Sequence, residues 1–103
     1  MQVINIEFYV LKIRRLAAKH QQGTGIVEIK KEVDVVFKEM KQKHRKSEHI
    51  YLWSELIPAL NNYLAKTATP EWHSVLRYAI TVCKRRLNTS KRSIPIFLGR
   101  IVK

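Results

Sequence analysis

Apolar side chains recur at helical spacing in the first half of the chain, and this pattern constrains the fold most strongly. The stripe consists of Ile26, Ile29, Val33, Val36, Phe37 and Met40. Residues three and four apart lie on one side of an α-helix, so the spacing predicts an amphipathic helix over about residues 25–45. The last turn of this helix carries cations, which complement the negative helix end. They are Lys41, Lys43, Arg45 and Lys46.

Two further segments show the same period. The third predicted helix begins at Ser47, a capping residue, and we expect it to kink or restart at Pro58. Its apolar face consists of Ile50, Trp53, Leu56, Ile57, Leu60 and Leu64. Residues 69–71, Thr-Pro-Glu, signal the start of a fourth helix over residues 70–87, which residues 88–90 end. This helix is expected to bury Trp72, Val75, Leu76, Ala79 and Cys83.

The N-terminal segment fits two kinds of structure. Residues 4–10 alternate apolar with polar side chains, as a strand does. A helical period is also present, in Val3, Ile6, Val10, Ile13 and Ala17. A helix over about residues 3–21 is favoured, because residues 11–22 are rich in helix formers and an isolated strand needs a partner. The only other strand-like stretch is residues 94–102.

The sequence therefore predicts an all-α fold, an antiparallel bundle of about four helices with a basic C-terminal tail. The second choice is an α+β fold in which an N-terminal strand pairs with that tail. With 103 residues and no internal repeat, we expect one domain over residues 1–103.

Positive charge is the second strong feature of the sequence. Twenty Lys and Arg stand against eight Asp and Glu, and no acidic residue follows Glu71. Like charges at this density repel one another in the folded state, and a polyanionic partner relieves that repulsion. Nucleic acid is the commonest such partner, followed by an anionic membrane surface or an acidic protein. We find no transmembrane segment or signal peptide and expect an intracellular, cytoplasmic protein.

The polar face of the predicted helix over residues 70–87 is the main candidate for phosphate contacts. Arg77 and Lys84 are seven residues apart and so lie on one side of the helix, with no carboxylate between them. The predicted contacts are Arg77, Lys84, Arg85, Arg86, Lys91, Arg92, Lys41, Lys43, Arg45 and Lys46. We therefore predict a nucleic-acid-binding protein, with DNA as the expected partner. If the two basic clusters lie on one side of the bundle, they form a stripe that follows a phosphate backbone.

Two other interpretations involve binding. Residues 60–80 resemble a helix-turn-helix motif, although Thr69 stands where glycine is usual. The motif positions are Leu64, Ala65, Val75 and Arg77. The alternative function is a protein-interaction or membrane-surface role, because size, charge and helical pattern are similar to those of the small immunity proteins that protect bacteriocin producers. That similarity implies an immunity- or regulator-type protein, and Val35, opposite the apolar stripe, is a candidate contact for a homodimer.

An enzyme, a metal site, a cofactor and a small-molecule substrate are not expected. The chain has no glycine-rich phosphate loop, and its four histidines, expected to be solvated, show no zinc spacing with the single cysteine, Cys83. Burial on an apolar stripe favours a structural thiol over a nucleophile. We expect Trp53 and Trp72 in the core, whereas Tyr51 and Tyr78 are better candidates for stacking on bases.

Overall fold

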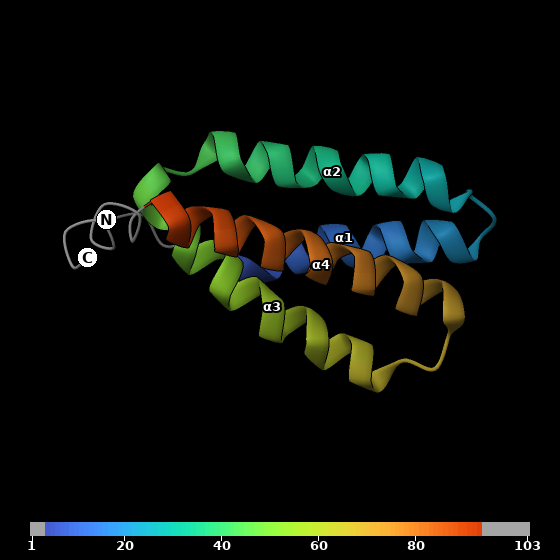
Figure 1. The fold of residues 1–103 in the computed structure, drawn as a ribbon. Helices are drawn as coiled ribbons and strands as arrows, with labels where there is room; N and C mark the ends of the chain where they lie inside the picture. The colour runs from blue at the N-terminus through green and yellow to red at the C-terminus, as the bar shows by residue number, and fades with distance from the viewer. Residues whose placement is uncertain (1–3, 94–103) are drawn as a thin grey trace.

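The computed structural model describes residues 4–93, which form an antiparallel helical bundle (Figure 1). The elements in chain order are α1 (Ile6–Gln21), α2 (Ile26–Lys43), the 3-10 helix η1 (Lys46–Glu48), α3 (His49–Lys66) and α4 (Pro70–Ser93). No strand occurs among the described residues, and the all-α prediction is confirmed. The strand considered for residues 4–10 is wrong, because α1 begins at Ile6. The predicted tail from residue 94 onward lies outside the described residues.

Helices α1 and α4 form the centre of the bundle, and α2 and α3 flank them on opposite sides (Figure 1). Helix α4 contacts all three other helices, most extensively α3 and α1. The α1–α2 and α3–α4 connections lie at one end of the bundle, whereas η1 and the last turns of α4 lie at the other (Figure 1). This topology brings the end of α2, the start of α3 and the end of α4 together.

One face of each helix supplies the core. The fully buried side chains include Val10, Ile13 and Ala17 of α1, Ile29, Val33, Phe37 and Met40 of α2, Leu52, Leu56 and Leu60 of α3, and Val75, Leu76, Ala79 and Cys83 of α4. The stripe predicted for residues 25–45 therefore faces the core, as expected. Trp53 is buried as predicted, but Trp72 is only half-buried and its Nε1 donates to Gln21 Oε1 at 2.6 Å.

Local signals fix both ends of α1. The side chain of Asn5 caps the helix, because its Oδ1 accepts a hydrogen bond from the Phe8 amide at 3.2 Å. At the other end Gly23 adopts a φ of 119°. The Gly23 amide donates to the carbonyl of His20, and the next amide, of Thr24, reaches back to Lys19. These crossed hydrogen bonds form a Schellman motif, which satisfies carbonyls that the helix leaves without partners.

Helix α3 differs from its predicted form in two ways. It begins at His49 rather than at Ser47, which belongs to η1. It also continues through Pro58 as one helix, so of the predicted kink or restart the restart does not occur. Pro58 is exposed, and the proline ring takes away the hydrogen-bond donor that the carbonyl of Ser54 would otherwise have. The opposite side remains packed in the core.

Helix α4 extends to Ser93, beyond its predicted end near Leu87. Polar residues 88–90 do not end it, because Thr89 Oγ1 donates to the Arg85 carbonyl at 3.0 Å and is satisfied within the helix. Leu87 also still packs against the core. The three polar residues 88–90 contain no glycine or proline. They therefore continue the helix, because its inner face still packs against the core.

Replacing Gly23 with alanine is expected to lower the free energy of unfolding by about 1–2 kcal/mol, because a Cβ disfavours positive φ. Gly25 is the matched control, since its φ is −61° and both glycines have open space around them. Gly25→Ala, at the N-cap of α2, should cost less than this, at most about 1 kcal/mol. Urea unfolding followed by circular dichroism measures both, and equal losses would contradict this helix end.

Candidate functional site

The end of α2 and the end of α4, which carry parts of the two predicted basic clusters, meet at one end of the bundle. They border a groove of about 860 Å³, which we call the end groove. Its walls come from the end of α2, from η1 with the start of α3, and from the last turns of α4. Among its lining residues are Lys41, His44, Lys46, Ser47, His49, Thr89 and Ser90. Of the predicted cations, Lys41 and Lys46 line this groove, and α4 contributes the uncharged Thr89 and Ser90 among the described residues.

The outward side of α4 carries the predicted polar face. Its exposed side chains, which we call the α4 face, are Ser74, Arg77, Thr81, Lys84, Arg85 and Asn88. From Arg77 to Thr89, at the end groove, the helix rises about 18 Å. Within the α4 face no residue is acidic, and Glu71 lies in the first turn of α4, at the opposite end of the bundle. The face therefore forms a ridge of positive charge that leads to the end groove.

Arg86 does not join the α4 face. Its guanidinium lies 5.9 Å from the ring centre of Phe37 and 5.7 Å from that of Trp53, and the residue is half-buried. Cation–π contacts of this kind belong to core packing. The sequence held a signal for this position, since Arg86 follows Ala79 and Cys83 at the spacing of the buried stripe.

The other predicted contacts divide by position. Lys41, Arg45 and Lys46 are exposed at the groove end, and we call them the corner cluster. Lys43 is exposed too, but two helical positions from Lys41 turn it about 200° to another side of α2. Lys91 and Arg92 belong to the last turn of α4, and their side chains lie outside the described part of the structure.

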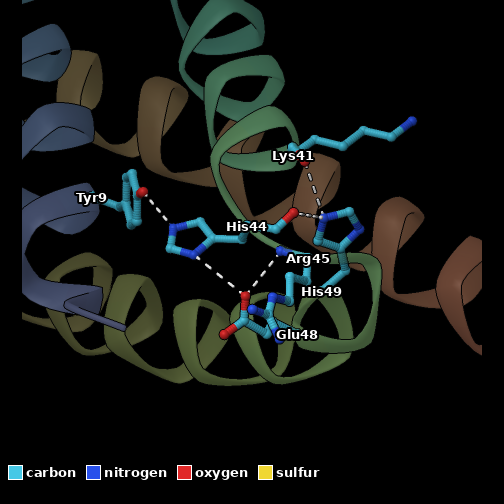
Figure 2. A network of polar contacts seen from close by, with 6 residues as sticks. All are labelled: Tyr9, Lys41, His44, Arg45, Glu48 and His49. Carbon is cyan, nitrogen blue, oxygen red and sulfur yellow. Dashed lines mark hydrogen bonds and ion pairs between the residues drawn. The ribbon is translucent and has the colours of Figure 1, made fainter. Parts of the chain in front are cut away.

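A buried histidine holds the corner between α2 and α3 (Figure 2). His49 is 8% exposed, and its Nε2 lies 3.2 Å from the carbonyl oxygen of Lys41 and 3.1 Å from that of His44. Carbonyl oxygens only accept hydrogen bonds, so Nε2 is the donor. The bond satisfies two carbonyls at the end of α2, which the helix itself cannot pair. The expectation of solvated histidines is wrong here, since His49 precedes Leu52, Trp53 and Leu56 on the buried side of α3.

A second histidine joins this corner to α1. The Tyr9 hydroxyl and His44 Nε2 share a hydrogen bond of 2.6 Å, and His44 Nδ1 lies 4.0 Å from Glu48 Oε1 (Figure 2). The same carboxylate oxygen accepts the Arg45 amide at 2.9 Å. Burial, and to a lesser extent the charge of Glu39, raises the pKa of the Tyr9 hydroxyl, which therefore stays protonated near neutral pH. These contacts fix the backbone on which the corner cluster stands.

Carboxylates gather on the α1–α2 side of the bundle. Lys12 Nζ lies 3.4 Å from Glu39 Oε2, and Lys19 Nζ lies 2.9 Å from Glu32 Oε1. Among the described side chains, no Lys or Arg of the α4 face or the corner cluster has a carboxylate within 4.0 Å. Within the described residues, the cations of the α4 face and the corner cluster are therefore unpaired, whereas two lysines of α1 are paired.

The two tyrosines proposed for base stacking differ. Tyr78 donates to Asp34 Oδ1 at 2.8 Å, a bond that raises its pKa, and Lys30 Nζ lies 5.3 Å from the centre of its ring. Its ring is thus engaged between α2 and α4. Tyr51, which is 51% exposed, keeps a free surface. The surface offers phosphates many cations but few aromatic rings.

The helix-turn-helix resemblance does not extend to the structure. Ala65, at the small-residue position, is exposed. Helices α3 and α4 also meet near both of their ends. The start of α3 and the end of α4 line the end groove, and Tyr63 of α3 with Trp72 of α4 line a shallow hollow at the other end. Helices that cross at about 90–120°, as in that motif, diverge at their far ends, so α3 and α4 form an antiparallel hairpin instead.

Cys83 has the properties of a structural thiol. It is fully buried, and burial raises its pKa to about 12, although the nearby Arg86 charge acts in the opposite direction. No group of three or more histidine, cysteine, aspartate or glutamate side chains suited to a metal ion occurs among residues with described positions. Within that same portion, no helix is long and apolar enough to cross a membrane.

Comparisons with family models, with curated proteins and with solved structures found no match for this chain. The geometry of the molecule is thus the basis for its functional assignment.

Native Cys83 is expected to react with iodoacetamide at least about a hundredfold more slowly than the unfolded chain, because a pKa of about 12 leaves little thiolate near neutral pH. Mass spectrometry of samples quenched over time, with and without guanidinium chloride, measures the two rates. Similar rates would show that the thiol is accessible in the folded protein.

Replacing His49 with leucine should lower the free energy of unfolding by about 1–3 kcal/mol, because two carbonyls at the end of α2 lose their donor. Tyr51→Leu is the control, since Tyr51 lies on the same helix and is half exposed. Chemical unfolding of both variants tests the account. A His49→Leu protein as stable as the control variant would show that this bond does not hold the corner.

Proposed function

We propose that this protein binds nucleic acid, DNA in the first place, through the α4 face and the corner cluster. The observation that carries the proposal is that the exposed, carboxylate-free α4 face leads to Thr89 and Ser90, which line the same groove as Lys41 and Lys46. Six exposed cations contribute to it: Arg77, Lys84, Arg85, Lys41, Arg45 and Lys46. Phosphate oxygens are the usual partners of such side chains.

The distribution of charge supports this proposal. The ion pairs Lys12–Glu39 and Lys19–Glu32 neutralise two lysines of α1, whereas the cations of the α4 face and the corner cluster have no such partner among the described side chains. Cations without carboxylate partners keep their full attraction for phosphate. A bound polyanion would also relieve the repulsion among them, which a formal charge of +12 imposes on the folded chain.

The dimensions indicate how such a complex would form. The rise of about 18 Å from Arg77 to Thr89 matches about five nucleotide steps of 3.4 Å. Few aromatic rings are exposed near the ridge, so contacts to phosphate rather than stacking on bases would supply the affinity. We therefore expect binding that depends weakly on sequence and strongly on salt.

A salt series is the first test of this function. If all six cations contact phosphates, the logarithm of the association constant should fall with the logarithm of salt concentration with a slope of about −5. Between about 50 and 200 mM salt, the affinity would then fall about a thousandfold. Mobility shifts with single- and double-stranded DNA and RNA measure the slope and rank the partners. Absence of binding at the lowest salt concentration would refute the proposal.

A pair of charge reversals locates the surface. Arg77→Glu with Lys84→Glu should weaken DNA binding at least about tenfold and reduce the magnitude of the salt slope by about two. Arg15→Glu with Lys31→Glu is the matched control, because both residues are exposed cations without ion pairs on the far helices and the net charge changes equally.

Equal losses in the two double variants would show that net charge alone, and not the α4 face, attracts the nucleic acid. Vesicles with anionic lipid provide a further arm of the test. Binding to these vesicles without binding to nucleic acid would favour a membrane-surface role instead.

A further inference from the structure

The end groove is rich in groups that donate hydrogen bonds. Lys41 and Lys46 bring two ammonium groups, and Ser47 adds a hydroxyl. No carboxylate is among its lining residues in the described part of the chain. Because each of these groups can donate to a different oxygen, the lining suits an anion with several acceptor oxygens close together.

One part of this lining is buried and held in place. His49 is 8% exposed, and its Nε2 donates to the carbonyl oxygens of Lys41 and His44. Its Nδ1 lies on the far side of the ring from those carbonyls (Figure 2). His44, also in the lining, is fixed by its hydrogen bond with Tyr9. Both rings are thus oriented before a ligand arrives, which lowers the entropy lost on binding.

The position of the end groove distinguishes it from the rest of the ridge. The α4 face is an open, convex helix side, along which a strand can continue in both directions. At Thr89 the ridge reaches the groove, whose other lining residues come from the end of α2 and from η1 with the start of α3. A strand that follows α4 in this direction therefore meets walls on several sides.

We propose that the end groove binds the terminal phosphomonoester of a nucleic-acid strand, an inference that rests on the nucleic-acid-binding function proposed above. A phosphomonoester has three strong acceptor oxygens and a charge of about −1.5 to −2 near neutral pH. An internal phosphodiester carries one negative charge, and the strand continues from it in both directions. The two lysines match the higher charge, and a groove at the end of the ridge matches a group at which the strand ends.

Three versions of one internally labelled DNA strand test this inference. One carries a 5′-phosphate, one a 3′-phosphate, and one has hydroxyls at both ends. Fluorescence anisotropy should show that one of the two phosphorylated strands, with either the 5′- or the 3′-phosphate, binds about fivefold or more tightly than the strand with two hydroxyl ends. The reason is that hydrogen bonds between charged groups are stronger than those between neutral groups.

Groove variants assign the preference to its site. Lys41→Gln with Lys46→Gln should remove most of the preference for the phosphorylated end, because both ammonium groups are lost while the backbone carbonyl that His49 binds remains. Arg15→Gln with Lys31→Gln, two exposed cations elsewhere, should keep the preference at the same change of net charge.

The outcomes separate the two proposals. Equal affinity for all three strands, or a preference that persists in the Lys41→Gln/Lys46→Gln protein, overturns the end-groove assignment and leaves nucleic-acid binding in place. Absence of binding to every strand overturns both.

Discussion

The turn from α2 into α3 depends on His49, and the position of the corner cluster depends on that turn. A helix that ends inside a protein leaves carbonyls without donors, and His49 supplies a donor to two of them from the first turn of α3. Tyr9 and Glu48 fix the same corner through His44 and the Arg45 amide. If another group donated to these carbonyls, α3 would leave α2 in a different direction, and the corner cluster would no longer lie next to the end of α4.

The packing of α4 produces the second half of the surface. Because α4 lies at the centre of the bundle and contacts all three other helices, most of its circumference is committed to apolar residues. Its polar residues therefore gather in one narrow exposed strip, the α4 face. Glu32 and Glu39 of α2, in contrast, pair with lysines of α1, and Asp34 accepts the hydroxyl of Tyr78. The same helix arrangement that builds the core thus leaves the exposed cations of α4 without carboxylate partners among the described side chains.

The local parts of this architecture could be predicted from the sequence, and the parts that depend on tertiary contacts could not. The stripe from Ile26 to Met40 predicted α2 and its buried side, because helical periodicity is a local property. The end of α4 was missed, since continued packing of Leu87 outweighs the polar residues that follow it. Arg86 was counted by its charge, although its spacing from Cys83 places it on the inner side. Whether residues 41–46 meet the end of α4 depends on the bundle topology, which no local pattern contains.

The central claim is that the unpaired cations of α4 and of the α2–α3 corner form one surface for a polyanion. Titration of the ¹⁵N-labelled protein with a short DNA strand, followed by amide chemical shifts, tests it most directly. The account predicts that the largest shifts fall in residues 41–50 and along the exposed side of α4, and that they weaken together as salt is added. Shifts concentrated on the α1–α2 side, or spread evenly over all four helices, would contradict it.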